Sequence, residues 1–111
     1  MSFKKEAKSR SYKIEIDATD EEGKFAGVAA AREKKGKLCI TNLYTVQQGK
    51  GLGSELLDDV LNWAKEQGIT NIEGGNFRPS VGDVDGQSAR EWYRKRGIKV
   101  DKKGRLKGQI K

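Results

Sequence analysis

The chain has no histidine, a single cysteine, a single proline and no long apolar run among its 111 residues. Without histidine, the side chain that most often serves as a catalytic base is excluded, so another group would have to accept protons. Cys39 alone excludes an internal disulfide framework. No run of about 18 apolar residues is present, so no membrane span is expected. The N-terminus has no apolar stretch typical of a secretory signal, and we therefore expect a cytoplasmic protein.

Charge and hydrophobicity set the size and the surface of the fold. Hydrophobic residues make up 34% of the chain and charged residues 35%, which predicts one small domain, residues 1–111, with a modest core. Pairing with a second copy would add stability, so a homodimer is one expectation. The net charge is +7, and residues 87–111 alone hold ten basic and two acidic groups. Such a segment attracts polyanions, and nucleic-acid binding therefore stays open.

Hydrophobic periodicity predicts an α/β fold. Segments in which apolar and polar residues alternate, and short runs of apolar residues, predict strands. Leucines at helical spacing predict the central helix over residues 53–67. The strand before this helix and the strand after it form a parallel pair. We expect a mixed, mostly antiparallel sheet of five or six strands with a second helix near the C-terminus. The predicted strands cover 12–16, 25–31, 38–46, 69–73, 98–100 and 105–110, the predicted helices 53–67 and 87–96, and a long loop 74–86.

A glycine-rich stretch, Gln48-Gly49-Lys50-Gly51-Leu52-Gly53, joins the strand over 38–46 to the central helix. Glycines let the backbone approach a bulky anion, and a helix N-terminus presents unpaired N–H groups to the same place. Such a junction is typical of a phosphate-binding site. The spacing differs from GxxxxGK[ST], and no GxGxxG opens a repeated βαβ unit, so nucleotide hydrolysis and dinucleotide binding are disfavoured.

A second motif follows about 40 residues later, Ala89-Arg90-Glu91-Trp92-Tyr93-Arg94-Lys95-Arg96-Gly97-Ile98. Together with Gln48, Gly51 and Gly53 it resembles the GNAT superfamily of N-acetyltransferases, which use acetyl-coenzyme A (acetyl-CoA). In that family a (Arg/Gln)-x-x-Gly-x-(Gly/Ala) loop is followed by a helix that ends in Ala-x-x-(aromatic)-Tyr-x-Lys-x-Gly. The resemblance spans residues 38 to about 100 and implies that the chain is an acyltransferase.

The resemblance also implies where acetyl-CoA lies. Backbone N–H groups of the glycine loop would hold its diphosphate, and the edge of the preceding strand would pair with its pantetheine arm. One N–H group of that strand would polarise the thioester carbonyl, and no metal is implied. The implied cofactor-binding residues are Leu43, Tyr44, Thr45, Val46, Gln48, Gly49, Lys50, Gly51, Leu52, Gly53 and Ser54.

The resemblance further implies the catalytic residues. Tyr93 would be the general acid that protonates the departing thiolate. For the general base, Glu73 at the end of the strand over 69–73 is the first candidate, acting directly or through a water. Asp83 and Asp85 in the predicted loop are the alternatives.

Two departures from the family pattern concern the acceptor site and the cofactor site. The N-terminal strand and two helices that usually wall the acceptor site are missing or reduced to a few residues, and Gly86 replaces an asparagine often found before the second motif, which removes one possible coenzyme contact. An open acceptor face suits an exposed amine on a macromolecule, or a pocket completed by a second subunit. The expected acceptor is an amine-bearing small molecule or protein. Three functions remain open: acetyl transfer to a primary amine, a CoA-binding regulatory module without efficient catalysis, and a basic nucleic-acid-binding domain.

Overall fold

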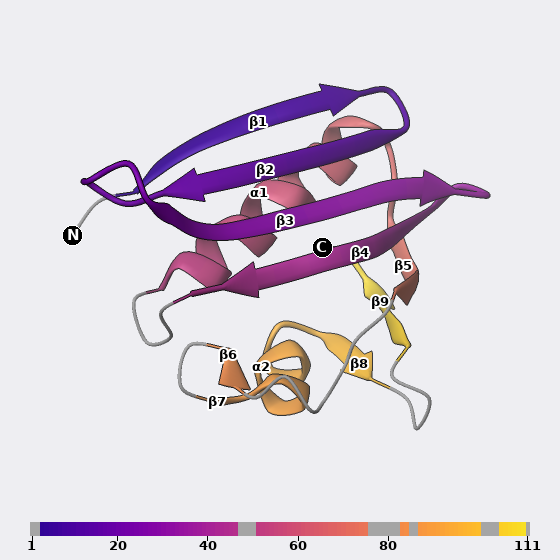
Figure 1. Ribbon diagram of the computed structural model, residues 1–111. Coiled ribbons are helices and arrows are strands. Elements are labelled where there is room, and N and C mark those ends of the chain that lie inside the picture. Colours follow the sequence, from indigo (N-terminus) through magenta and orange to yellow (C-terminus); the bar gives the residue numbers. More distant parts are fainter. Residues whose placement is uncertain (1–2, 47–50, 76–82, 85–86, 101–104, 111) are drawn as a thin grey trace.

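The computed structural model describes residues 3–46, 51–75, 83–84, 87–100 and 105–110. They form one seven-stranded sheet in the order β1-β2-β3-β4-β5-β9-β8, a small hairpin β6-β7, and two helices (Figure 1). The elements are β1 (Lys4–Arg10), β2 (Lys13–Thr19), β3 (Phe25–Lys34), β4 (Lys37–Thr45), α1 (Leu52–Glu66), β5 (Asn71–Gly75), β6 (Asp83–Val84), β7 (Gln87–Ser88), α2 (Ala89–Lys95), β8 (Ile98–Val100) and β9 (Leu106–Gln109).

The topology confirms the predicted mixed, mostly antiparallel sheet. Strands β1 to β4 form an antiparallel meander, and β9 pairs antiparallel with both β5 and β8. The pair β4–β5 is parallel, and α1 connects the two strands. The glycine junction therefore lies where β4 ends and α1 begins. Residues 101–104, between the predicted strands over 98–100 and 105–110, lie outside the described residues.

Helix α1 packs on one face of the sheet. Its apolar side chains Leu52, Leu56 and Val60 are fully buried and continue the core formed by Ile14, Ile16 and Leu38 of the strands. This is the amphipathic pattern that the leucine spacing predicts. In Figure 1, α1 lies behind β2 and β3 as they are drawn.

Gly27 of β3 brings the first turns of α1 close to the sheet. A Cβ atom at Gly27 would lie 3.1 Å from Leu52 Cδ2, 3.3 Å from Leu56 Cδ1 and 2.8 Å from the carbonyl oxygen of Tyr44. The last distance is shorter than real Cβ contacts, so only glycine fits without a shift. The N-terminus of α1 is thereby held against the end of β4.

Strand β1 is the element that sequence periodicity does not reveal, and with it the sheet has seven strands rather than five or six. All seven residues of β1 are exposed, and its sequence, KKEAKSR, has no apolar alternation. The strand forms by pairing along its whole length with β2. In addition, Lys5 Nζ lies 2.7 Å from Asp59 Oδ2 and 3.5 Å from Glu55 Oε1 of α1, which raises the pKa of Lys5. Charged side chains on an edge strand also disfavour pairing with other chains.

The face of β1–β4 opposite α1 has no helix over it among the described residues. A two-residue turn, residues 11–12, joins β1 directly to β2, which agrees with the missing pair of helices noted in the sequence. Two exposed aromatic rings stack on each other, Phe25 of β3 and Tyr44 of β4, with ring centroids 6.4 Å apart. The described helices include none that is long and apolar enough to cross a membrane.

The second half of the chain differs from the predicted boundaries by a few residues. Residues 87–88 form β7, so α2 begins at Ala89 rather than at residue 87. Gly74 and Gly75 extend β5 instead of opening the predicted loop. Of that loop, residues 76–82 and 85–86 lie outside the described part, and β6 supplies Asp83 and Val84.

Candidate functional site

At the junction between β4 and α1, the N-cap residue of the helix has no side chain that could cap it. Gly51 is the N-cap of α1, with φ 78° and ψ 0°, a left-handed conformation that glycine adopts without strain. No side chain caps the helix, and the first turn is opened by Leu52, Gly53 and Ser54. The first N–H groups of a helix have no intrahelical acceptor, so these groups are suited to bind an anion. The predicted site residues Gln48, Gly49 and Lys50 lie outside the described residues.

Arg96 adds a positive charge at the same place. Its guanidinium Nη2 donates a hydrogen bond to Ser54 Oγ in the first turn of α1, and this contact is partly buried. The two residues are 42 positions apart in the sequence, so the fold brings the end of α2 to the beginning of α1. A guanidinium and helix N–H groups together form a strong site for a phosphate group. In the sequence alone, Arg96 is one of ten basic residues in the segment 87–111, and nothing there predicts its contact with Ser54.

The edge of β4 that faces β5 is paired only at its beginning. The parallel register consists of Leu38 with Ile72 and Ile40 with Gly75, and among the described residues no pairing continues from Thr41 to Thr45. β5 ends at Gly75, so β4 extends past the last residue of its parallel neighbour (Figure 1). A bulge at Thr41 follows the last pair, because the register between β3 and β4 shifts there. The resemblance implies that the two strands diverge here, and residues 76–82, which follow β5, lie outside the described residues.

The main chain of β4 alternates between its two neighbours. The Val46 N–H donates to the Ala26 carbonyl oxygen at 2.8 Å, so Val46 and Tyr44 direct their main-chain groups toward β3. Leu43 and Thr45 therefore direct their N–H and C=O groups to the opposite side, away from β3. Of the four implied residues in this strand, these two can pair with an extended ligand.

Tyr93 of α2 is buried, with 3% of its surface exposed. Burial raises the pKa of its phenol above the ordinary value, because the charged phenolate loses hydration. The phenol therefore stays protonated at neutral pH, as a proton donor must. The same shift makes the phenol a weaker acid than an exposed tyrosine.

Glu73 lies on β5, two residues before the last pair with β4, and its side chain is 52% exposed. It accepts a hydrogen bond from Lys37 Nζ, and this contact together with the charge of Lys37 lowers the pKa of the carboxyl. The Glu73 carboxyl is therefore ionised at neutral pH. Its side chain lies outside the buried core. Asp83 lies in β6, whereas Asp85 is outside the described residues.

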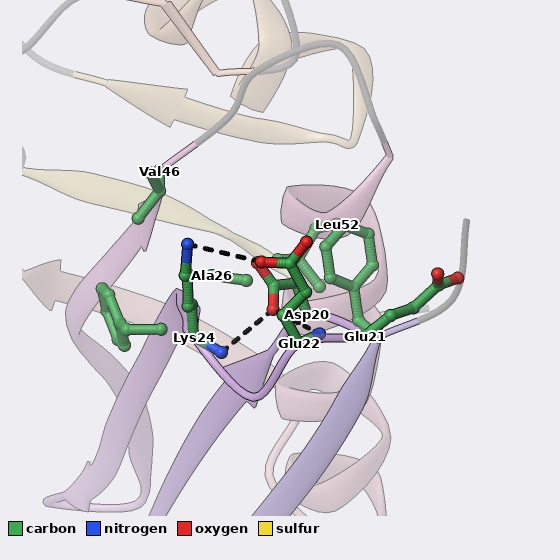
Figure 2. Close-up of a pocket in the computed structure, with 9 residues that line it drawn as sticks. Asp20, Glu21, Glu22, Lys24, Ala26, Val46 and Leu52 are labelled. Atoms are coloured by element: carbon green, nitrogen blue, oxygen red, sulfur yellow. Dashed lines mark hydrogen bonds and ion pairs between the residues drawn. The ribbon is translucent and has the colours of Figure 1, made fainter.

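A pocket of about 420 Å³ lies beside the glycine junction. It is bounded by the β2–β3 turn and by Val46 and Leu52, the residues on either side of the junction (Figure 2). Asp20 holds the turn together, since its Oδ1 accepts the N–H groups of Glu22 and Lys24 at 2.9 Å. Among the described residues, three carboxylates and the single cation Lys24 line this pocket, so its lining is less suited to an anion than the Arg96 side of the helix. Within the described part of the chain, no cluster of three or more metal-ligating side chains occurs.

Comparison with solved structures agrees with this fold. Among solved structures, a GNAT acetyltransferase from Staphylococcus aureus Mu50 superposes with a TM-score of 0.73 at 18% identity, over 91% of this chain and 70% of that one. The PaiA N-acetyltransferase of Thermoplasma acidophilum, solved with coenzyme A, gives 0.68 at 18% identity, over 90% of this chain and 62% of that one. A glucosamine N-acetyltransferase region of a fungal multi-domain β-N-acetylglucosaminidase gives 0.62 at 26% identity, over 82% of this chain and 12% of that one.

Sequence comparison gives the family directly. No curated protein matches the chain. Residues 2–108, however, match the family described as the acetyltransferase (GNAT) domain. This match includes the glycine junction, strand β4 and the Tyr93 helix. The chain belongs to the GNAT acetyltransferase family and is an acyltransferase of the N-acetyltransferase class.

Proposed function

We propose that the protein transfers an acetyl group from acetyl-CoA to a primary amine. The observation that carries the proposal is the edge of β4 at Leu43 and Thr45, which has no strand partner among the described residues and ends beside the N-terminus of α1, where no side chain caps the helix. An extended amide-containing arm that leads to a diphosphate fits both features, because the first needs main-chain partners and the second needs an anion. Acetyl-CoA has both groups and supplies an acyl thioester for the reaction.

The residues of the site would have different roles in the reaction. The N–H groups of Leu43 and Thr45 hold the arm, and one of them donates to the thioester carbonyl oxygen as negative charge develops there. The N–H groups of the first turn of α1, with Arg96, bind the diphosphate. The Tyr93 phenol donates toward the departing sulfur. Glu73 receives the proton of the attacking amine, directly or through a water.

Thiol release tests this function. We expect acetyl-CoA to give free coenzyme A thiol when a primary amine is present and essentially none when the amine is replaced by the matching alcohol. Release should be measured over a panel of small amines and lysine-containing peptides. If acetyl-CoA raises the melting temperature but no amine releases thiol, the chain is a binding module rather than an enzyme. If neither effect occurs, the proposal is wrong.

Replacing Arg96 by glutamine should weaken acetyl-CoA binding about 10- to 100-fold, because a charge-assisted hydrogen bond to phosphate contributes about 1.5–3 kcal/mol. The matched control is Arg94→Gln, an exposed arginine on the same helix. Isothermal titration with acetyl-CoA measures both variants. Equal affinities for the two variants would remove Arg96 from the phosphate site.

A further inference from the structure

A groove lies on the outer face of the second half of the sheet, away from the pocket at the glycine junction. It has a volume of about 910 Å³ and is lined by β5, β8, β9 and the first residue of β4. The neighbours of its charged residues in the strands, among them Ile72, Ile98 and Leu106, are buried in the core. Because side chains alternate along a strand, the charged residues face outward.

Four charged side chains form a row across this groove. Glu73 on β5 is directly opposite Lys107 on β9, and Lys107 is directly opposite Lys99 on β8. Lys37 at the start of β4 completes the row through its hydrogen bond to Glu73. The row thus holds three ammonium groups and one carboxylate, with a net charge of +2.

The positive charge of the three lysines in this row exceeds the negative charge of Glu73. Lys99 and Lys107 face each other across an antiparallel pair, where like charges are destabilising. The charge of Lys107 also acts on Glu73, which Lys37 already contacts. Among the residues that the structure describes, no acidic side chain pairs with Lys99. An anion placed between these lysines would relieve the repulsion.

The groove adjoins the place where an acceptor must arrive. Gly75 forms the last pair between β5 and β4, with Ile40, and Glu73 precedes it by two residues, about 7 Å along the strand. β5 ends at that pair, whereas β4 continues to Thr45. A molecule in the groove would therefore have one end near the last β4–β5 pair and the other over the lysines of β8 and β9.

We propose that this groove binds the amine acceptor and selects small molecules that carry an anionic group, such as a phosphate, in addition to the amine. Glu73 attracts the amine end, and Lys99 and Lys107 contact the anionic end. The Lys37–Glu73 pair is no obstacle, because both side chains are exposed and such surface pairs rearrange easily. The inference rests on the proposed acetyl transfer for its substrate class, but the anion site itself is independent of it.

Matched acceptors test the selectivity. We expect kcat/KM for 2-aminoethyl phosphate, or for its 3-aminopropyl or 6-aminohexyl homologue, to exceed that of the corresponding amino alcohol by about tenfold or more. The double variant Lys99→Gln/Lys107→Gln should lose this preference and keep its activity on the amino alcohol and its KM for acetyl-CoA. The control Lys8→Gln, an exposed lysine on β1 outside the groove, should behave like the wild type. Equal kcat/KM values for phosphate and alcohol, or a raised KM for acetyl-CoA in the double variant, would overturn the proposal.

A binding measurement separates this proposal from the proposed function. Methyl phosphate, which has no amine, should shift the amide NMR signals of β8 and β9 in the wild type and not in the double variant. If these shifts occur while no amine is acetylated, the groove binds anions and the transfer activity is what fails. If methyl phosphate gives no shifts, or only a long oligonucleotide does so, the groove is not a site for a small anionic acceptor.

Discussion

Replacing Gly51 by aspartate is expected to abolish acetyl-CoA binding, with at least about a 100-fold loss of affinity. The new carboxylate would lie at the N-cap of α1, where the diphosphate binds, and a like charge at about 5 Å costs a few kcal/mol in a partly exposed site. It would also accept hydrogen bonds from the helix N–H groups that the ligand needs. Isothermal titration with acetyl-CoA measures the loss.

Gly51→Asn is the matched control for this substitution. Asparagine has nearly the same size as aspartate, tolerates the left-handed conformation and can also cap a helix, but it is neutral. A Cβ atom at this position would meet no atom within 4 Å, so both variants should fold. We expect asparagine to cost less than about tenfold in affinity. Similar losses in the two variants would show that charge at this place is not what matters, which would contradict a diphosphate site at the start of α1.

Replacing Tyr93 by phenylalanine should lower kcat about 100-fold or more while the dissociation constant for acetyl-CoA changes by less than about twofold. Positioned proton donors contribute about 10²–10⁴-fold to rates, and the substitution removes only the hydroxyl. The ring would still fill its place in the core, so the melting temperature should fall only slightly. Steady-state kinetics with a saturating amine measures the effect.

The pH dependence of the wild type gives a second view of Tyr93. Burial raises the pKa of this phenol, so the folded protein keeps the proton at a pH where an exposed tyrosine would lose it. A tyrosine in the unfolded chain ionises near pH 10. The contribution of the buried phenol to the free energy of unfolding is therefore fully present below that pH and decreases above it. Tyr93→Phe should weaken this alkaline decrease in stability.

The kinetic prediction has its own contradicting outcome. If kcat is unchanged in Tyr93→Phe, Tyr93 is not the proton donor.

The parts of the fold with strong hydrophobic patterns could be predicted from the sequence. Leucines at helical spacing predict α1 to within one residue at each end, because one face of the helix is buried and the other is charged. The apolar run over 38–46 likewise predicts β4. Strand β1 could not be predicted, since its seven residues are exposed and it forms through backbone pairing with β2 and the Lys5 contacts to α1.

The site was only partly predictable for a different reason. Glycines and the tyrosine motif have local spacings that the sequence shows directly, and the resemblance gives them roles. The contact of Arg96 with Ser54, by contrast, depends on how α2 meets α1, and the row formed by Lys37, Glu73, Lys107 and Lys99 depends on strand register. Contacts between residues far apart in sequence become visible only in the folded chain.

Amide hydrogen exchange, measured with and without acetyl-CoA, tests the central claim most directly. In the free protein, the N–H groups of Tyr44 and Val46 should be protected by β3, whereas those of Leu43 and Thr45 should exchange faster. Acetyl-CoA should slow exchange at Leu43 and Thr45 and in the first turn of α1, because the ligand becomes the missing partner of these groups. If Leu43 and Thr45 are already protected without acetyl-CoA, or if saturating acetyl-CoA leaves their exchange unchanged, the proposed binding site is wrong.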